Sequence, residues 1–270
     1  WLSGDGCVGF AHNRLSIIDI SANGHQPMSS ANGDLKIIFN GEIYNYKELK
    51  SKLIALGYSF NSSSDTEVLL CGYEAWGSDL FKSLEGMFAF AIYDLKKNKL
   101  LLVRDGAGEK PLFYSLVNKS IFFSSEIKAL LDFHVIGKDI DISSLNHLFS
   151  RGYSSHTQSI FSNIFKLDAG NYLEYDVKTR KSQISKFWSL EQKIQESFSS
   201  KPSTNLNADY LITKLENLLE SSIDKQLNAD VPVGMLLSGG VDSSILVALA
   251  ARSRNQLDTF TVKFADHAGY

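Results

Sequence analysis

The chain has 270 residues, 44% of them hydrophobic, and a formal net charge of −3 at pH 7. This length exceeds one average domain, so we expect two domains, or one domain and part of another. The slightly acidic balance gives no basic surface for nucleic acid or for an anionic membrane. Two cysteines, Cys7 and Cys71, are too few for a disulfide framework, which favours a reducing, cytoplasmic compartment. We expect neither a membrane-spanning helix nor a signal peptide, because no apolar run has the required length.

The first two thirds of the chain alternate apolar runs of strand length with segments of helical spacing. A strand is expected at 15–20, and a second at 35–39 that ends at Asn40-Gly41-Glu42. Apolar residues at helical spacing predict helices at 46–56 and 64–76. Further strands are expected at 88–94, 99–104, 112–115, 121–124, 161–167, 171–175 and 186–188, with short helices at 126–131 and 143–149. Short strands joined by polar turns indicate an antiparallel sheet.

The composition changes near the end of this part. Residues 191–207 include a stretch rich in Ser, Lys, Pro and Asn without periodicity, which predicts a linker. An amphipathic helix is expected at 208–227, followed by an apolar strand at 233–237, a helix from Ser243 and a strand at 259–264. Strand, helix and strand begin a parallel βαβ unit. Two strands are too few for a stable open sheet, so we expect the chain to lack its C-terminal part. Its start at Trp1 suggests that the N-terminal part is missing as well.

The turn between the predicted strand and helix has the composition of an anion site. It reads Ser238-Gly239-Gly240-Val241-Asp242-Ser243-Ser244. Glycines let backbone N–H groups approach a phosphate, and a helix N-terminus adds partial positive charge. The serines add hydroxyl donors, and Ser243 or Ser244 can cap the helix. The common phosphate loop has a Lys before its Ser or Thr, whereas Asp242 stands here, so a bridging Mg²⁺ is the natural inference. A tight turn without a ligand is the alternative.

Polar residues stand beside the apolar strands of the first part. Arg14 offers a planar fork to a carboxylate, and Glu42 and Asp65 are suited to an α-ammonium group. The Asn40 amide and the Gly41 N–H group are suited to an oxyanion. Together they suit a free α-amino acid whose side-chain carbonyl is attacked. Singly, each also has an ordinary structural role in a surface ion pair, a turn or a helix cap.

Several motifs, in this order, resemble the glutamine-hydrolysing asparagine synthetase family, and the resemblance covers nearly the whole chain. The motif of the second part is the loop from Ser238 to Ser244 described above. The motifs of the first part are Arg14-Leu15-Ser16-Ile17-Ile18-Asp19, His25-Gln26-Pro27-Met28, Phe39-Asn40-Gly41-Glu42-Ile43-Tyr44-Asn45, Ser64-Asp65-Thr66-Glu67, Leu84-Glu85-Gly86-Met87-Phe88-Ala89, Arg104-Asp105 with Gly108 and Lys110-Pro111-Leu112, and Phe123-Ser124-Ser125-Glu126.

The resemblance implies a fold for each part of the chain. Residues 1–190 are expected to form an incomplete α+β N-terminal-nucleophile fold, a four-layer αββα sandwich that acts as a type 2 glutamine amidotransferase domain. Residues 191–207 are the expected linker. Residues 208–270 are expected to begin an α/β adenine-nucleotide α-hydrolase (PP-loop) domain, which is the ATP-pyrophosphatase part of an asparagine synthetase.

The resemblance also implies an ATP-dependent carbon–nitrogen ligase with glutamine as amido donor. Arg14 would bind the glutamine carboxylate, Asn40 and Gly41 would stabilise the oxyanion, and Glu42 and Asp65 would hold the ammonium group. Ammonia would then attack an aspartyl-adenylate, giving asparagine, AMP and pyrophosphate. The implied partners are glutamine, aspartate and ATP with Mg²⁺, without nucleic acid or membrane, and a homodimer stays open. The residues expected to line the glutamine pocket are Leu15, Ser16, Ile17 and Ile18.

In the second part, the resemblance implies nucleotide contacts from the backbone at Leu237 and Val262. Asp242 would lie near Mg²⁺. The pyrophosphate end would be held by Ser238, Gly239, Gly240, Asp242, Ser243 and Ser244.

The sequence departs from the family in one important respect. The family's nucleophile is the cysteine exposed when the initiator Met is removed, and neither Cys7 nor Cys71 corresponds to it. A chain of this extent is therefore expected to hydrolyse neither glutamine nor ATP by itself. Two alternatives stay open: an amidotransferase of the same fold acting on another carboxylate, such as a polysaccharide sugar acid, and a degenerate paralogue without activity.

Overall fold

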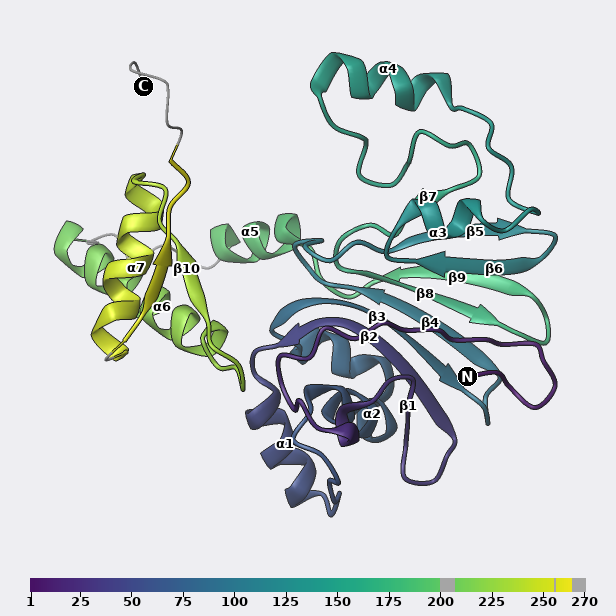
Figure 1. Cartoon of the computed structure of the whole chain (residues 1–270), viewed down its shortest axis with the longest axis horizontal. Coiled ribbons are helices and arrows are strands. Elements are labelled where there is room, and N and C mark those ends of the chain that lie inside the picture. Colours follow the sequence, from purple (N-terminus) through teal and green to yellow (C-terminus); the bar gives the residue numbers. More distant parts are fainter. Residues whose placement is uncertain (200–206, 255, 264–270) are drawn as a thin grey trace. The chain divides into compact units, whose positions relative to one another are not determined.

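The computed structural model describes residues 1–199, 207–254 and 256–263 (Figure 1). The chain divides into two compact units, residues 1–199 and 200–270. The first unit ends with helix α5 (Leu190–Ser199), so the first half of the predicted linker is helical; residues 200–206 lie outside the described residues. Within the described part of the chain, no helix is both long and apolar enough to cross a membrane.

A six-stranded antiparallel sheet forms the centre of the first unit, in the order β1-β2-β3-β4-β8-β9. Its strands are β1 (Met28–Ser29), β2 (Leu35–Ile43), β3 (Gly86–Asp94), β4 (Lys99–Arg104), β8 (Asn171–Asp176) and β9 (Lys181–Lys186). The last seven residues of β3 are all buried, so both faces of this strand are covered. Alternation of side chains between the two faces sends Phe88, Phe90 and Ile92 into one core and Ala89 and Ala91 into another.

Helices α1 (Tyr46–Ala55) and α2 (Asp65–Trp76) cover one face of this sheet (Figure 1). Their apolar side chains and those of the 3₁₀ helix η2 (Gly77–Ser83) form one cluster with β2 and β3. Ser64 is the N-cap of α2, and its Oγ accepts a hydrogen bond from Thr66 N at 3.1 Å. Because Ser64 caps the helix, the carboxylate of Asp65 is left for another role.

A three-stranded sheet, in the order β6-β5-β7, packs on the opposite face. Its strands are β5 (Phe113–Val117), β6 (Ser120–Ser124) and β7 (Phe165–Lys166). The short helix α3 (Ile127–Leu131) packs on the outer face of this sheet through Leu130, and helix α4 (Ile142–Arg151) follows it in the chain (Figure 1). The order helix, sheet, sheet, helix is the four-layer sandwich that the sequence predicts.

Several local predictions for the first unit were wrong. Of the strand expected at 161–167 only Phe165–Lys166 forms, and in place of the strand expected at 186–188 the structure has β9, which ends at Lys186. Residues 15–20 form an irregular segment with the 3₁₀ turn η1 (Ala22–Gly24) after it, because the Arg14 guanidinium takes the carbonyls that a strand would pair. Strand β2 also continues through Asn40-Gly41-Glu42 instead of ending before them. Residues Asn40 and Gly41 pair with Ala89 and Phe88 of β3.

The second unit contains helix α6 (Ala208–Gln226) and a βαβ unit of β10 (Gly234–Leu236), α7 (Val241–Ser253) and β11 (Asp258–Phe260). Strands β10 and β11 are parallel, as the sequence predicts. Its small core consists of Ile223, Leu227, Leu249 and Ala250. Helix α7 begins at Val241, two residues before the predicted start. Strand β11 is shorter than the predicted 259–264, of which residue 264 lies outside the described part of the chain.

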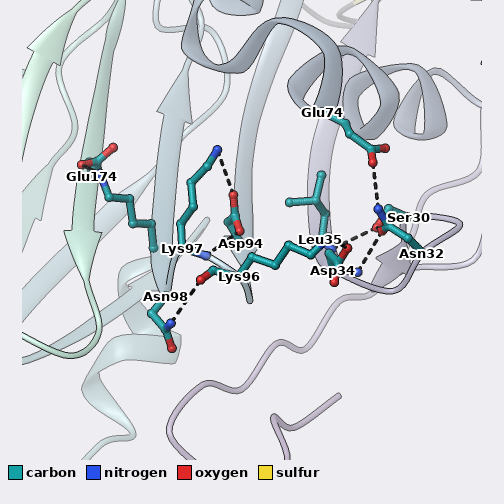
Figure 2. A network of polar contacts seen from close by, with 11 residues as sticks. Ser30, Asn32, Asp34, Leu35, Glu74, Asp94, Lys96, Lys97, Asn98 and Glu174 are labelled. Carbon is teal, nitrogen blue, oxygen red and sulfur yellow. Dashed lines mark hydrogen bonds and ion pairs between the residues drawn. The ribbon is translucent and has the colours of Figure 1, made fainter.

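Polar contacts join the turns at one end of the large sheet (Figure 2). Lys96 forms an ion pair with Asp34 at 2.5 Å, and Asn32 Nδ2 donates to Glu74 of α2 at 2.8 Å. The Lys99–Glu174 pair, at 2.6 Å, joins β4 to β8 in the same region. The Lys96 side chain is largely exposed, so its pair adds little to stability.

A fully buried carboxylate, Asp105, organises the other end of the sheet. It accepts hydrogen bonds from the backbone N–H groups of Phe88 at 3.2 Å, Glu109 at 2.9 Å and Lys110 at 3.0 Å. The neighbouring Arg104 donates to the carbonyls of Gly108, Lys110 and Leu167. These bonds hold the loop 105–110 against β3.

Replacing Asp105 with Ala should therefore destabilise the first unit strongly. Three backbone donors, the buried N–H group of Phe88 and the partly buried contacts of Glu109 and Lys110, would lose their acceptor, which costs roughly 3 kcal/mol of the free energy of unfolding. The matched control is Lys96→Ala, which removes an exposed ion pair and should leave the urea midpoint unchanged. Equal urea midpoints for the two variants would contradict the role given to Asp105.

Candidate functional site

Strand β2 and the first turn of α2 meet through two buried side chains. The Asp65 carboxylate accepts a hydrogen bond from Ile43 N at 3.1 Å, which places Asp65 beside the end of β2. Gln26 Oε1 accepts from Phe39 N at 2.6 Å, and its Nε2 donates to Thr66 Oγ1 at 3.2 Å. Gln26 thus fixes the spacing of β2 and α2. The sequence places Gln26 in a family motif but does not reveal this role.

The side-chain pKa values of the two acidic residues, Asp65 and Glu42, are both raised. Burial is the main reason why the pKa of Asp65 rises to about 6, and the charge of Glu42 raises it further while Arg14 lowers it. Burial likewise raises the pKa of Glu42, against the opposing charge of Lys110. Two carboxyl groups that repel each other in a partly buried position have the chemistry that suits a cation, and their contact with an ammonium group stays a prediction. The influence of Arg14 on Asp65 shows that the predicted anion-binding residue lies in the same region.

The guanidinium of Arg14 is held by the backbone that follows it. Its Nη1 donates to Asp19 O at 2.8 Å and its Nη2 donates to Ile18 O at 2.6 Å. Leu15 is 85% exposed, whereas Ile18 is buried in the core with the helices. Ser16 and Ile17 are half-buried. The four residues therefore have different surroundings, and their contact with glutamine stays a prediction.

Gly41 stands where two strands approach each other too closely for a side chain. Its φ is +149°, and a Cβ atom added to it would lie 2.1 Å from the Met87 carbonyl oxygen. Only glycine adopts this conformation without strain. The neighbouring Asn40 Nδ2 donates to Ser125 Oγ at 3.4 Å, so the amide is directed toward the segment after β6. The turn that the sequence offered as the ordinary role of Asn40-Gly41 is absent, because both residues lie within β2.

The glycine loop of the second unit lies beyond the C-terminal ends of β10 and β11. Gly239 has φ of +83° and open space around it, and Gly240 is the N-cap of α7. The sequence predicts that Ser243 or Ser244 caps the helix, but neither side chain does so in the structure. Their hydroxyls instead donate to the Gly240 carbonyl, at 3.2 Å and 2.8 Å. The Ser238 and Ser243 hydroxyls are 3.0 Å apart.

The other predicted nucleotide residues follow the same two strands. Leu237 N donates to Phe260 O at 2.8 Å, and Thr261 Oγ1 donates to Leu237 O. Val262 comes two residues after β11 and is 76% exposed. Asp242 is exposed in the first turn of α7. Ligands of open parallel sheets bind outside the carboxyl ends of the strands, which is where all these residues lie.

Neither cysteine has the properties of an activated nucleophile. Cys7 is exposed, and a hydrogen bond with Asp5 raises the pKa of its thiol. Cys71 lies in α2, where burial raises the pKa of its thiol to about 11. Both shifts disfavour the thiolate that attacks carbonyl groups. The described residues also contain no cluster of three or more His, Cys, Asp or Glu side chains that could hold a metal ion.

Comparison with known proteins defines the class of the molecule. Residues 1–188 match the family model described as the glutamine amidotransferase domain, and residues 214–270 match the model described as asparagine synthase. The chain therefore belongs to the glutamine amidotransferase family. This membership agrees with the four-layer sandwich and confirms the predicted N-terminal-nucleophile fold of the first unit.

Particular relatives agree with this assignment. The chain is 40% identical over 264 residues to glutamine-hydrolyzing asparagine synthetase 2 of Bacillus subtilis, covering 96% of this chain and 34% of that protein. It is 37% identical over 259 residues to asparagine synthetase 1 of the same organism, covering 95% and 39%. The chain thus spans between a third and two fifths of the length of these two relatives. The solved structure of a glutamine phosphoribosylpyrophosphate amidotransferase from B. subtilis aligns with a TM-score of 0.46 and 19% identity, covering 93% of this chain and 50% of that chain.

The close approach of β2 and β3 predicts an unusually large effect for Gly41→Ala. The new Cβ would meet backbone atoms of Met87 and Phe88, and the φ of +149° is unfavourable for alanine. We expect a loss of roughly 3–6 kcal/mol in the free energy of unfolding, measured with urea. Gly33→Ala is the matched control, because Gly33 has φ of +77° but open space around it. That variant should lose roughly 1–2 kcal/mol, and an equal loss in both would refute the steric explanation.

Proposed function

We propose that this protein is a glutamine-dependent asparagine synthetase. The observation that carries the proposal is the pair of carboxyl groups of Glu42 and Asp65, with the charge of Arg14 acting on Asp65, in a domain of the glutamine amidotransferase family. A free α-amino acid presents an ammonium group and a carboxylate on one carbon atom, and this arrangement of charges matches both. The names of the relatives, asparagine synthetases, and the second family match support aspartate as the acceptor.

In the first unit, Arg14 would bind the α-carboxylate of glutamine through its remaining N–H donors. Glu42 and Asp65 would hold the α-ammonium group and thereby lose part of their mutual repulsion. The side-chain amide of the substrate would then lie near Asn40 and Gly41. A thiolate that attacks this amide creates a tetrahedral oxyanion, which hydrogen-bond donors at those two positions would stabilise. The collapse of the oxyanion releases ammonia.

The nucleophile of this step is not assigned to a residue of this sequence, because the thiols of Cys7 and Cys71 are both disfavoured as thiolates. We propose the N-terminal cysteine that the family resemblance implies, with its free amine as the base. The tests of activity below therefore use the full-length protein. We place the reaction in the cytoplasm, where ATP and both amino acids are available.

In the second unit, the loop from Ser238 to Ser244 would hold the phosphates of ATP at the N-terminus of α7. The donor set fits Mg²⁺, because Asp242 is an exposed carboxylate within the loop and Mg²⁺ is commonly held by one or two carboxylates together with phosphate oxygens and water. Bound Mg²⁺ would neutralise phosphate charge. Without a Lys in the loop, the arrangement suits attack of the aspartate carboxylate on the α-phosphorus of ATP, which releases pyrophosphate and leaves an aspartyl-adenylate. Ammonia would then attack the acyl carbon of this adenylate, and AMP would depart to leave asparagine.

The decisive experiment gives the full-length protein aspartate and Mg-ATP, with either glutamine or ammonium chloride as nitrogen source, and measures asparagine and pyrophosphate. Asp65→Asn should lower kcat/KM for glutamine by roughly a hundredfold and leave the ammonia-dependent rate unchanged, because the Asn side-chain oxygen can still accept from Ile43 N whereas the charge that attracts the ammonium group is lost. Asp242→Asn should lower both rates.

Asp209→Asn is the control for Asp242→Asn, since Asp209 is also an exposed acid in the first turn of a helix, and it should change neither rate. Absence of both products in the wild-type reaction would refute the proposal. Pyrophosphate release that requires a carboxylate other than aspartate would instead support the alternative acceptor.

The raised pKa of Asp65 predicts a pH dependence of glutamine use. Only the ionised carboxylate attracts the ammonium group, so kcat/KM for glutamine should fall about tenfold per pH unit below the pKa of about 6. Asp65→Asn should remove this inflection. If kcat/KM of the wild-type protein for glutamine does not change over the roughly two pH units from 5 to 7, Asp65 is not the ammonium partner.

The same raised pKa has the opposite effect on stability. Between pH 3.8, the ordinary pKa of an Asp, and about 6, Asp65 holds a proton in the folded state but not in the unfolded state. The contribution of Asp65 to the free energy of unfolding therefore falls as the pH rises through that window.

A further inference from the structure

Gly24 lies directly against the guanidinium of Arg14. A Cβ atom added to Gly24 would be 2.4 Å from Nη1, 2.6 Å from Nη2 and 2.7 Å from Cζ of Arg14, and these are its three nearest neighbours. The residue is buried in the turn η1, and its backbone is outside the left-handed region that favours glycine. The absence of a side chain at Gly24 is therefore explained by the space that the guanidinium occupies and not by backbone conformation.

The guanidinium is fixed from a second direction by two carbonyl groups. Nη1 and Nη2 each donate one hydrogen bond, to Asp19 O and Ile18 O. A guanidinium carries five N–H groups in a rigid plane, so three further donors remain. With Gly24 against it and the two carbonyls accepting from it, the guanidinium plane is held from two directions. Its orientation is thus set before any carboxylate arrives.

The turn that carries Gly24 is itself tied to the segment that precedes Asp65. The buried carboxylate of Asp19 accepts from Ser21 N at 3.0 Å and from Ser63 N at 2.8 Å. Burial raises the pKa of Asp19, but hydrogen bonds from Ser21 and Ser63 outweigh this effect and lower it, so the carboxylate is ionised at neutral pH. A second link joins Asn23 Nδ2 to the Asn61 carbonyl at 3.2 Å. The part of the site that carries Arg14 and the part that carries Asp65 are therefore joined by hydrogen bonds.

We propose that Gly24 is a positioning residue for the glutamine site: it sets how far the Arg14 guanidinium stands from Asp65 and so fits the site to the short span between the carboxylate and the ammonium group of a free α-amino acid. This inference rests on the proposed function of the first unit. Gly24 would not touch the substrate, and any side chain at this position would push the guanidinium out of place. Because the guanidinium is the far end of a flexible side chain, the displacement costs little stability.

The test measures the steady-state kinetics of the full-length protein for glutamine and for ammonia. Gly24→Ala should raise KM for glutamine roughly tenfold to a hundredfold, with a much smaller change in kcat, because a charge-assisted contact with the carboxylate is weakened. The ammonia-dependent rate and the urea midpoint should stay at wild-type values. Gly4→Ala is the matched control, since Gly4 also has an ordinary φ but open space around its Cβ position, and it should change none of these quantities.

A double-mutant cycle shows whether Gly24→Ala changes KM for glutamine through Arg14 or in another way. In an Arg14→Ala background the space beside Gly24 is open, so Gly24→Ala should cause no further rise in KM. Two outcomes would overturn the inference: an unchanged KM in the single variant Gly24→Ala, or a rise of the same size in the Arg14→Ala background. If Arg14→Ala itself leaves KM for glutamine unchanged, the glutamine site of the proposed function fails, which is a distinct result.

Discussion

The hydrogen bond from Ile43 N to the Asp65 carboxylate is the interaction that positions the acidic side of the candidate site. It joins the end of β2 to the first turn of α2 and buries an ionisable group that would otherwise be hydrated. Burying a carboxylate is unfavourable, and the cost appears as the raised pKa. A fold optimised for stability alone would place an apolar residue here. The site therefore holds an unfavourable charge in place by packing two secondary-structure elements around it.

The opposite charge is held in a different way. Arg14 lies in an irregular segment. Its guanidinium is held by hydrogen bonds to two backbone carbonyls and occupies the space that a side chain at Gly24 would fill. Asp19 and Gln26 then connect this segment to α2 and β2. The two halves of the site thus come from a regular framework and from a loop, and buried polar side chains join them. Loops held by a rigid scaffold commonly carry binding residues in this manner.

The sequence predicts most strands and helices of the first unit and the parallel pair of the second because alternation, helical spacing and turn residues are local signals. The four-layer order of the first unit follows from the family resemblance instead. Prediction from the sequence fails where tertiary contacts override these local signals. The segment 15–20 reads as a strand, but Arg14 occupies its carbonyls. The second strand is expected to end at Asn40-Gly41-Glu42, but the positive φ of Gly41 is accommodated within β2, which continues to Ile43. The motifs locate Arg14, Glu42 and Asp65, whereas the connecting role of Gln26 depends on contacts 13 and 40 residues away in the sequence.

The burial of β3 on both faces has a consequence for the chemistry next to it. Strand β2 pairs with β3 along its whole length, from Leu35 to Ile43, so Asn40 and Gly41 belong to one of the most constrained parts of the molecule. The proposed oxyanion donors are consequently preorganised: their dipoles already have a fixed direction when negative charge develops, and little reorganisation energy is spent during the reaction. The same rigidity limits evolutionary change, since a substitution in β3 would move the backbone on which those donors lie.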